Sequence, residues 1–446
     1  MFALLPTFTP GAENLDMRNR SLLSAVPFSR DVMLYLLAWG FVAFGYFGIQ
    51  GVLFNLYLLR LGYDTAFVGL LVGVGQVAWA GFALPASWIG ERIGLRNALV
   101  AAHLTVTFSL SLLLFDEWLP PAIQTPWLFF WWIMLWLGAA MNTVNSIPFL
   151  MATATPERRN AAFSAQQAVM AVAGLTGAII AGFLPHVLAV LTGSALSAAQ
   201  PYSLALRVAP LAYVAAAAIL MAARNVHPSR QAATGRVSGR APVGMLIFFG
   251  LIVFLQSASE GSTRAFFNIY LDLGLALRTD RIGMLMGCAQ LLPVLAAVAT
   301  PALLSRRSAA GTYRVGVLGI AASLLILAIF PNWAAAGAAY GGVVMMTAVS
   351  AISRNLLSQE IVAQPWRTKT AATVTIGVAL GWGAMAMVGG YLIDGTGFRF
   401  VFLIGAGLAL TAALLLSALR GHMTITPASS ELRNSSESDH AERRTA

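Results

Sequence analysis

The sequence has little charge for its length. Only 10% of its 446 residues are Asp, Glu, Lys or Arg, whereas roughly 25% is usual in a soluble domain. Hydrophobic residues make up 58%. Because so little polar surface cannot cover that apolar mass in water, the composition excludes an ordinary soluble enzyme, a disordered protein and a nucleic-acid-binding module. It favours a protein whose solvent is the lipid bilayer.

Lysine and cysteine are almost missing. Among 27 basic residues only Lys369 is a lysine, so nearly all the positive charge is arginine. The single cysteine, Cys288, excludes a disulfide framework and a cysteine zinc site. The chain also lacks a Gly-x-x-x-x-Gly-Lys phosphate loop and a His-Glu-x-x-His zinc motif. We therefore expect no cofactor, no metal and no enzymatic activity.

Long apolar runs dominate what is present. A helix needs about 20 mostly apolar residues to span a bilayer. The runs are continuous and lack the period-2 alternation of barrel strands, which favours helices. We predict twelve membrane-spanning helices: Val32–Leu59, Phe67–Ile89, Ala98–Leu114, Trp127–Met151, Ala161–Val190, Tyr202–Met221, Val243–Leu271, Ile282–Leu304, Val315–Phe330, Trp333–Leu357, Thr370–Ile393 and Phe400–Leu419.

The only long polar stretch between these runs divides them into six and six. The expected organisation is a cytoplasmic N-terminal tail (1–31), a six-helix bundle (32–223), a cytoplasmic linker (224–242), a second six-helix bundle (243–420) and a disordered cytoplasmic tail (421–446). Within the first tail, Met17 precedes Arg18 and Arg20 and is an alternative start of the protein.

The distribution of basic residues predicts the orientation. Twenty of the 27 Lys and Arg residues lie in the tails and the even-numbered connections, and five lie in the odd-numbered connections. The other two, Arg264 and Arg354, lie within helices. By the positive-inside rule, both termini and the linker are cytoplasmic. A bacterial inner membrane is the expected location, and its anionic lipid explains the net charge of +10 without nucleic acid.

The two halves of the chain repeat each other. Short matching segments recur in the same order at the end of the first and seventh helices and after the fourth and tenth. They are Phe54–Leu58 (Phe-Asn-Leu-Tyr-Leu) with Phe267–Leu271 (Phe-Asn-Ile-Tyr-Leu), Leu61-Gly62 with Leu273-Gly274, Val68-Gly69-Leu70 with Ile282-Gly283-Met284, and Pro156-Glu157-Arg158 with Pro365-Trp366-Arg367. Parallel six-helix repeats are typical of transporters whose two bundles move around a site at the membrane midplane.

The connection between the second and third helices carries a family motif. Residues 87–96 read Ser-Trp-Ile-Gly-Glu-Arg-Ile-Gly-Leu-Arg. This resembles the Gly-x-x-x-Asp-Arg-x-Gly-Arg-Arg signature of the major facilitator superfamily, which the chain resembles over nearly its whole length. The resemblance implies an all-α integral membrane fold of two pseudo-symmetric six-helix bundles, and a monomer. It also implies that Glu91, Arg92, Gly94 and Arg96 are gating residues at the cytoplasmic face.

A polar stripe on the seventh predicted helix is the main candidate for function. Gln256, Glu260, Arg264 and Asn268 recur every fourth residue, so they share one face of that helix. An ionised carboxylate in the bilayer is costly, and Glu260 is the only acid that we expect to be buried there. Burial favours its protonated form, whereas a nearby guanidinium favours the carboxylate. We predict that Glu260 and Arg264 couple to protons; a permanent ion pair between them is the alternative.

Other polar residues in the predicted helices form the candidate substrate-binding set. The family resemblance implies a cavity lined by helices one, four, seven and ten, with contributions from five, eight and eleven. The set consists of Gln50, Asn55, Asn142, Asn145, Gln166, Gln167, Gln256, Asn268, Gln290 and Arg354. Hydrogen bonding between helices is the alternative for each amide. Arg354 has three possible roles: binding an anionic group, pairing with Glu260, or snorkelling to the interface. We expect His103 to be a packed residue.

The resemblance implies a secondary transporter that moves a small organic solute by alternating access. We expect protons as the coupling ion, the lipid bilayer as surroundings, and no nucleic acid as a partner. Gly174, Gly177 and Gly182 of the fifth helix resemble a glycine motif of drug–proton antiporters and favour efflux, with close helix packing as the alternative. Proton-coupled import of a sugar, peptide or organic acid, an uncoupled uniporter, and a transporter-like membrane receptor stay open.

Overall fold

The computed structural model describes residues 28–227, 243–362 and 366–423. Most of the predicted tails and of the predicted linker lies outside these ranges; the last helix runs to Met423, three residues into the tail predicted to be disordered. Within the described ranges, 12 helical spans are long and apolar enough to cross a membrane.

The first bundle comprises α1 (Arg30–Ala43), the π-helical segment η1 (Phe44–Gln50), α2 (Gly51–Arg60), α3 (Thr65–Ile93), α4 (Leu95–Leu113), α5 (Pro121–Thr153), α6 (Arg159–Thr192), α7 (Gln200–Leu206) and α8 (Val208–Met221), with short 3₁₀ turns at η2 (Asp116–Trp118) and η3 (Pro156–Arg158). The second bundle comprises α9 (Val243–Ile269), the π-helical segment η4 (Tyr270–Gly274), α10 (Thr279–Ala289), α11 (Leu292–Arg306), α12 (Ala309–Ile329), α13 (Trp333–Glu360), α14 (Arg367–Thr396) and α15 (Phe398–Met423).

All twelve predicted helices are confirmed, and most extend beyond the predicted bounds. The ninth, predicted from Val315, begins at Ala309, where the Ser308 side chain accepts a hydrogen bond from Gly311 N at 3.2 Å. An apolar run shows which part of a helix can lie in the hydrocarbon core of the bilayer. The polar capping residues that set its true ends lie outside the run.

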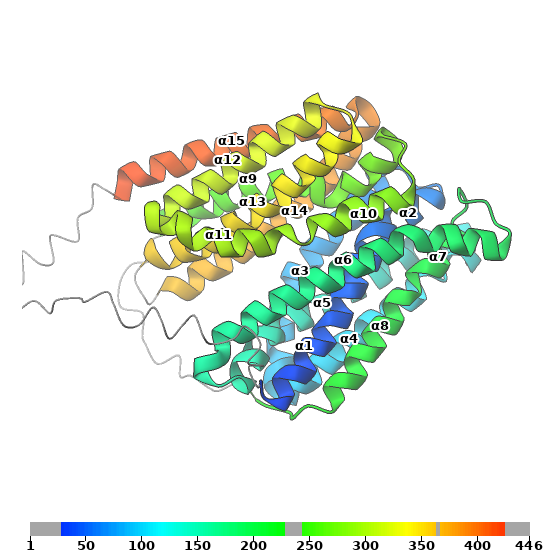
Figure 1. The fold of residues 1–446 in the computed structure, drawn as a ribbon, viewed down its shortest axis with the longest axis horizontal. Helices are drawn as coiled ribbons and strands as arrows, with labels where there is room; N and C mark the ends of the chain where they lie inside the picture. The colour runs from blue at the N-terminus through cyan, green and yellow to red at the C-terminus, as the bar shows by residue number, and fades with distance from the viewer. Residues whose placement is uncertain (1–27, 228–242, 363–365, 424–446) are drawn as a thin grey trace, which may run out of the picture.

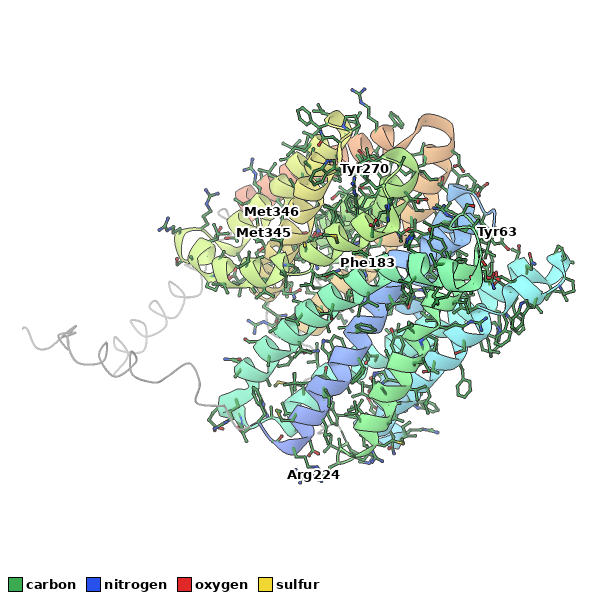
Figure 2. The ribbon with its side chains drawn as sticks, turned by 45° about the vertical axis from the view of Figure 1, so that its right-hand side comes forward. Tyr63, Phe183, Arg224, Tyr270, Met345 and Met346 are labelled. Carbon is green, nitrogen blue, oxygen red and sulfur yellow. The ribbon has the colours of Figure 1, made fainter. Side chains whose placement is uncertain are left out.

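The two bundles meet at one end of the molecule and diverge at the other (Figure 1). We name the end where α1 begins and α8 ends the linker end, and the end where α2 ends and α3 begins the far end. Figure 2 shows Arg224 at the linker end of the first bundle and Tyr63 at its far end. At the far end α2, α6 and α10 come together (Figure 1).

Hydrogen bonds join the bundles near the far end through the two repeated Phe-Asn segments. Asn55 Nδ2 donates to Ala265 O at 2.8 Å and to Asn268 Oδ1 at 3.2 Å. In return, Asn268 Nδ2 donates to Val52 O at 3.1 Å. Each asparagine thus bonds the backbone of the opposite repeat.

An ion pair lies just beyond these asparagines. Arg60 donates from both terminal nitrogens to the two carboxylate oxygens of Asp272, at 2.7 and 2.9 Å. We call Asn55, Arg60, Asn268 and Asp272 the far-end seam. Other far-end bonds between the bundles join Thr65 to Asp394 at 2.5 Å and Tyr202 to Thr279 at 3.1 Å.

The predicted fifth-helix glycines lie where helices approach closely. A Cβ on Gly177 of α6 would lie 2.5 Å from the carbonyl oxygen of Phe44, and a Cβ on Gly182 would lie 2.9 Å from that of Thr279. Gly174 faces Phe47 and Gln290 at ordinary contact distances. These glycines let α6 pack against η1 in its own bundle and against α10 in the other.

We predict that Gly177→Ala destabilises the protein, because the added methyl group cannot fit without moving η1. Overpacking of this kind costs about 1–3 kcal/mol, more than the gain of about 1 kcal/mol in helix propensity at most. The measurement is the thermal unfolding midpoint of the purified protein in detergent. Gly81→Ala in α3 is the matched control, because nothing lies within 4 Å of its Cβ position. Equal midpoints for the two variants would contradict the packing argument.

Candidate functional site

A cavity of about 220 Å³ lies between the two bundles. Most of its lining comes from α1, η1, α3, α4, α5 and α8 of the first bundle. The second bundle contributes Arg264 of α9 and Trp382 of α14. Since both residues are within the membrane-spanning part of their helices, the cavity lies deep in the fold.

Aromatic side chains form much of the cavity wall. Trp79 of α3 and Trp382 of α14 stack across the two bundles, with ring centroids 6.5 Å apart and an interplanar angle of 25°. Tyr46 meets Trp136 edge to face at 6.4 Å. The wall therefore offers ring faces from both bundles.

Four lining side chains carry a buried polar atom that has no hydrogen-bond partner among the described residues. These atoms are Trp39 Nε1, Gln76 Oε1, His103 Nδ1 and Trp136 Nε1. Unsatisfied polar groups are rare in folded proteins because each costs about 1–3 kcal/mol. Four of these atoms thus belong to residues of one cavity wall.

Arg264 is the charged residue of the cavity lining. Its side chain is exposed, although its neighbours on α9 are buried. The guanidinium lies 4.2 Å from the centre of the Trp382 ring and donates to Tyr46 Oη at 3.5 Å. Among the residues that the structure describes, no carboxylate is within ion-pair distance of it. The permanent Glu260–Arg264 ion pair, which was the alternative to proton coupling, is therefore not formed in this structure.

Glu260 is buried behind Trp382. Gln256 Nε2 donates to one of its carboxyl oxygens, and Trp382 Nε1 donates to the other at 3.3 Å. The same indole thus contacts Glu260 through its N–H and Arg264 through its ring face. Trp382 is the physical connection between the buried carboxyl and the cavity.

Arg354 approaches Glu260 from α13 through an intermediary. Its Nη1 donates to Gln256 Oε1 at 2.7 Å, and Tyr313 Oη donates to the same oxygen at 3.2 Å. Because Gln256 is fully buried, the guanidinium points into the bundle. The snorkelling alternative is wrong for this structure, and the pairing with Glu260 is indirect. We call Glu260, Arg264 and Arg354 the charge cluster.

The predicted substrate-binding amides lie in different surroundings. Asn142 lines the cavity, where its Oδ1 is 3.2 Å from His103 Nε2. Asn55 and Asn268 lie in the far-end seam, where their amides bond the opposite bundle. Gln256 belongs to the network behind Trp382.

The remaining amides do not line the cavity. Asn145 donates within the first bundle to the carbonyls of Ala86 and Met141, and Gln166 donates to Tyr35 Oη at 2.8 Å. These bonds are the interhelical and intrahelical uses that sequence alone leaves open. Three others are placed as follows: Gln50 is buried in η1, Gln167 is exposed on α6, and Gln290 is half-buried at the end of α10.

The predicted gating motif lies at the linker end and contacts its own bundle. Gly94 has a φ of +87°, a left-handed conformation that suits glycine. Arg96 donates to two carbonyls at the end of α8, at 3.1 and 3.2 Å. The Arg92 guanidinium lies 3.9 Å from the centre of the Trp88 ring, and Glu91 is exposed. The gating role of these residues stays a prediction.

Sequence reasoning missed several residues of this region. Gln76 is a lone amide in an apolar run, and that pattern could have identified it as a candidate cavity residue. Tryptophans such as Trp382 are common in membrane helices, so the sequence does not single them out. His103 was expected to be packed and is buried, but it also lines the cavity. The expectation of a single buried acid was wrong: Asp31 and Asp116 are also buried, near helix ends, where each has a hydrogen-bonding partner.

The hydrogen-bonding partners of Asp31 and Asp116 lie at opposite ends of the first bundle. Arg224 Nε donates to Asp31 at 2.8 Å at the linker end, and Tyr57 Oη donates to Asp116 at 2.5 Å near the other end. Neither acid lines the cavity.

No family model and no curated protein sequence matches the chain. Solved structures do. The chain is similar to a mutant of the nucleoside transporter NupG, with a TM-score of 0.67 and 15% identity over 87% of this chain and 99% of that one. It is similar to a bacterial homologue of the human lysosomal transporter Spinster in an inward-facing, occupied conformation, with a TM-score of 0.68 and 13% identity over 87% and 95%. It is also similar to the xylose transporter XylE from E. coli in an inward-open conformation, with a TM-score of 0.67 and 14% identity over 86% and 95%. The chain therefore has the major facilitator fold, with twelve helices in two six-helix bundles.

Proposed function

We propose that this protein is a multi-pass membrane transporter that moves a small organic solute by alternating access, coupled to protons at Glu260. The observation that carries the proposal is the cavity between the bundles, to which the buried carboxyl is joined through Trp382. The similar solved structures are described as transporters of nucleosides and xylose, which supports a transport role for the fold.

The proposed resting state is open toward the linker end. Hydrogen bonds and an ion pair between the bundles close the far end, whereas the bundles diverge toward the linker end (Figure 1). The arginine count makes the linker end cytoplasmic, so this state is inward-facing. Two of the similar structures are also described as inward-facing or inward-open.

Coupling in this scheme passes through one side chain. When Glu260 is ionised, it accepts the Trp382 N–H and holds the indole under Arg264. A proton on Glu260 weakens that bond, and a solute that contacts Arg264 or the ring shifts the same indole. Because coupling between two binding events is reciprocal, solute binding and proton binding then alter each other.

We predict that Glu260→Gln abolishes proton-coupled transport while the protein still inserts and binds solute. Glutamine keeps the shape and an acceptor for Trp382 but cannot ionise. The measurement is internal pH in liposomes that hold the purified protein, followed as candidate solutes are added under an imposed pH gradient. Glu360→Gln, an exposed carboxyl at the linker end of α13, is the control and should retain coupling. Unchanged solute-dependent proton movement in Glu260→Gln would remove Glu260 from the mechanism.

The same assay separates the rival functions. Proton movement opposite to the solute means efflux by antiport, the direction favoured by the fifth-helix glycines. Movement in the same direction means symport, as in the uptake alternative. Solute flux that ignores the pH gradient means a uniporter, and binding without flux means a receptor.

We predict that Arg60→Gln shifts the protein toward a state closed at the linker end. The substitution leaves the Asp272 carboxylate, only 8% exposed, without its partner and so destabilises the far-end seam. The measurement is the distance distribution between spin labels at Thr155→Cys and Gln359→Cys, two exposed linker-end positions in different bundles, in a background with Cys288→Ser. Short distances should increase.

Arg278→Gln is the matched control for this test. Arg278 pairs with Asp280 in its own bundle and is 64% exposed, so its loss removes the same charge without touching the seam. Exchanging the partners, as Arg60→Asp with Asp272→Arg, should restore the original distances. Identical distributions for Arg60→Gln and Arg278→Gln would show that the ion pair does not hold the far end closed.

A further inference from the structure

We infer that the solute is an aromatic anion: a compact planar ring system that carries a carboxylate or a similar acidic group. The inference rests on the proposed transport function, and it comes from the charges, rings and unsatisfied atoms of the cavity. Each of these constrains a different part of the solute.

The charge cluster has an excess of positive charge. It contains two guanidiniums, Arg264 and Arg354, and one carboxyl, Glu260, so it is positive whether or not Glu260 is protonated. The other titratable groups nearby are Tyr46, Tyr213, Tyr313, Tyr340 and His103, and with ordinary side-chain chemistry none of these is an anion near neutral pH. A net cation in the membrane interior is costly without an opposite charge. The solute is the component able to supply it.

Arg264 is the point at which that charge acts on the cavity. It is exposed there, and among the described residues its ring and hydrogen-bond partners are the Trp382 indole and the hydroxyl of Tyr46. The described lining contains no Asp or Glu, so a cationic solute would meet Arg264 without compensation. A carboxylate would instead accept a charge-assisted, bidentate hydrogen bond from the guanidinium.

The rings select for a planar partner. Five aromatic side chains line the cavity, with Trp382 from the second bundle and Trp39, Tyr46, Trp79 and Trp136 from the first. The indole nitrogens of Trp39 and Trp136 are buried donors without partners among the described residues. Aromatic side chains gain a stacking or edge-on interaction with an aromatic ring beyond area burial, a gain that a saturated ring does not share.

The volume of the cavity favours a compact solute. A cavity of about 220 Å³ is below the range of about 300–1,000 Å³ that is usual for drug-sized ligands. One ring or two fused rings with a short acidic side chain suit this space.

The positive cluster also links the anion to the proton. A proton on Glu260 removes the only negative charge of the cluster, which strengthens the attraction of Arg264 and Arg354 for an anion. An anion in the cavity in turn favours the protonated state of Glu260. Binding of the two together is the signature of symport, so the inference favours the uptake alternative over efflux.

The test is calorimetric titration of the purified full-length wild-type protein in detergent with two matched sets of probes. The one-ring set is phenylacetate, phenylacetamide, phenethylamine and cyclohexylacetate. The two-ring set is indole-3-acetate, indole-3-acetamide and tryptamine. We expect the aromatic acid of at least one set to bind about tenfold or more tightly than its amide and its amine, because it gains a charge-assisted bond to Arg264. Phenylacetate should also bind more tightly than cyclohexylacetate.

Variants assign the preference to residues. Arg264→Met should reduce the ratio of acid to amide affinity to near one, whereas Arg264→Lys should keep part of it. Trp382→Leu should reduce the preference for phenylacetate over cyclohexylacetate. Arg306→Gln, which removes an exposed arginine from the linker end of α11, should leave both ratios unchanged. If a variant fails to fold, the ranking of probes by the wild type still decides the inference.

The inference is overturned if the amide or the amine binds as tightly as the acid in both sets, or if neither acid binds. Flux assays separate that failure from failure of the proposed function. Liposomes that transport another solute, without binding the aromatic acids, would retain the function and refute the inference. Tight binding of an aromatic acid with no flux would do the reverse.

Discussion

The reciprocal contact of Asn55 and Asn268 is the hydrogen-bonded junction between the two bundles near the far end. Each amide reaches the backbone of the other repeat, and the two side chains also bond each other at 3.2 Å. The Arg60–Asp272 pair then extends this junction toward the far end. Because the bonds are concentrated at one end, the bundles are held together there and the cavity lies beneath the junction, on the side where the bundles diverge (Figure 1).

Charges inside the membrane are held in this protein mainly by neutral intermediaries. Gln256 stands between Arg354 and Glu260, and Trp382 stands between Glu260 and Arg264. A direct ion pair would neutralise its partners and tend to fix them in one arrangement. An amide or an indole can exchange its bond when a proton or a ligand arrives. Under the proposed mechanism, indirect contact therefore leaves the carboxyl responsive to what occupies the cavity.

The sequence predicts the parts of this structure that are set by local chemistry. Long apolar runs predict all twelve helices, and the four-residue spacing of Gln256 and Glu260 predicts that they lie on one face, where they do bond. Contacts with side chains from other helices are not predicted by such local patterns. No pattern within the eleventh run indicates that Trp382 meets Glu260, since that contact depends on how the bundles pack.

The asparagines also show that local sequence does not predict which helix a side chain contacts. Asn142 lines the cavity, Asn145 donates to backbone carbonyls, and Asn55 joins the bundles, although all three are asparagines in apolar helices. The one clue to the role of Asn55 was the repeat itself. Residues at equivalent positions of two related halves can meet at the pseudo-symmetry axis, as Asn55 and Asn268 do. The proposed alternating access requires the two end states to differ by only a few kcal/mol, so bonds lost on opening of this junction would have to be replaced by others. The exposed Glu91 and Arg92 lie at the linker end, where those replacement contacts would have to form. In the proposed cycle, the far-end asparagines and the linker-end motif act on the same equilibrium, so we expect a change at either end to alter the population of both states.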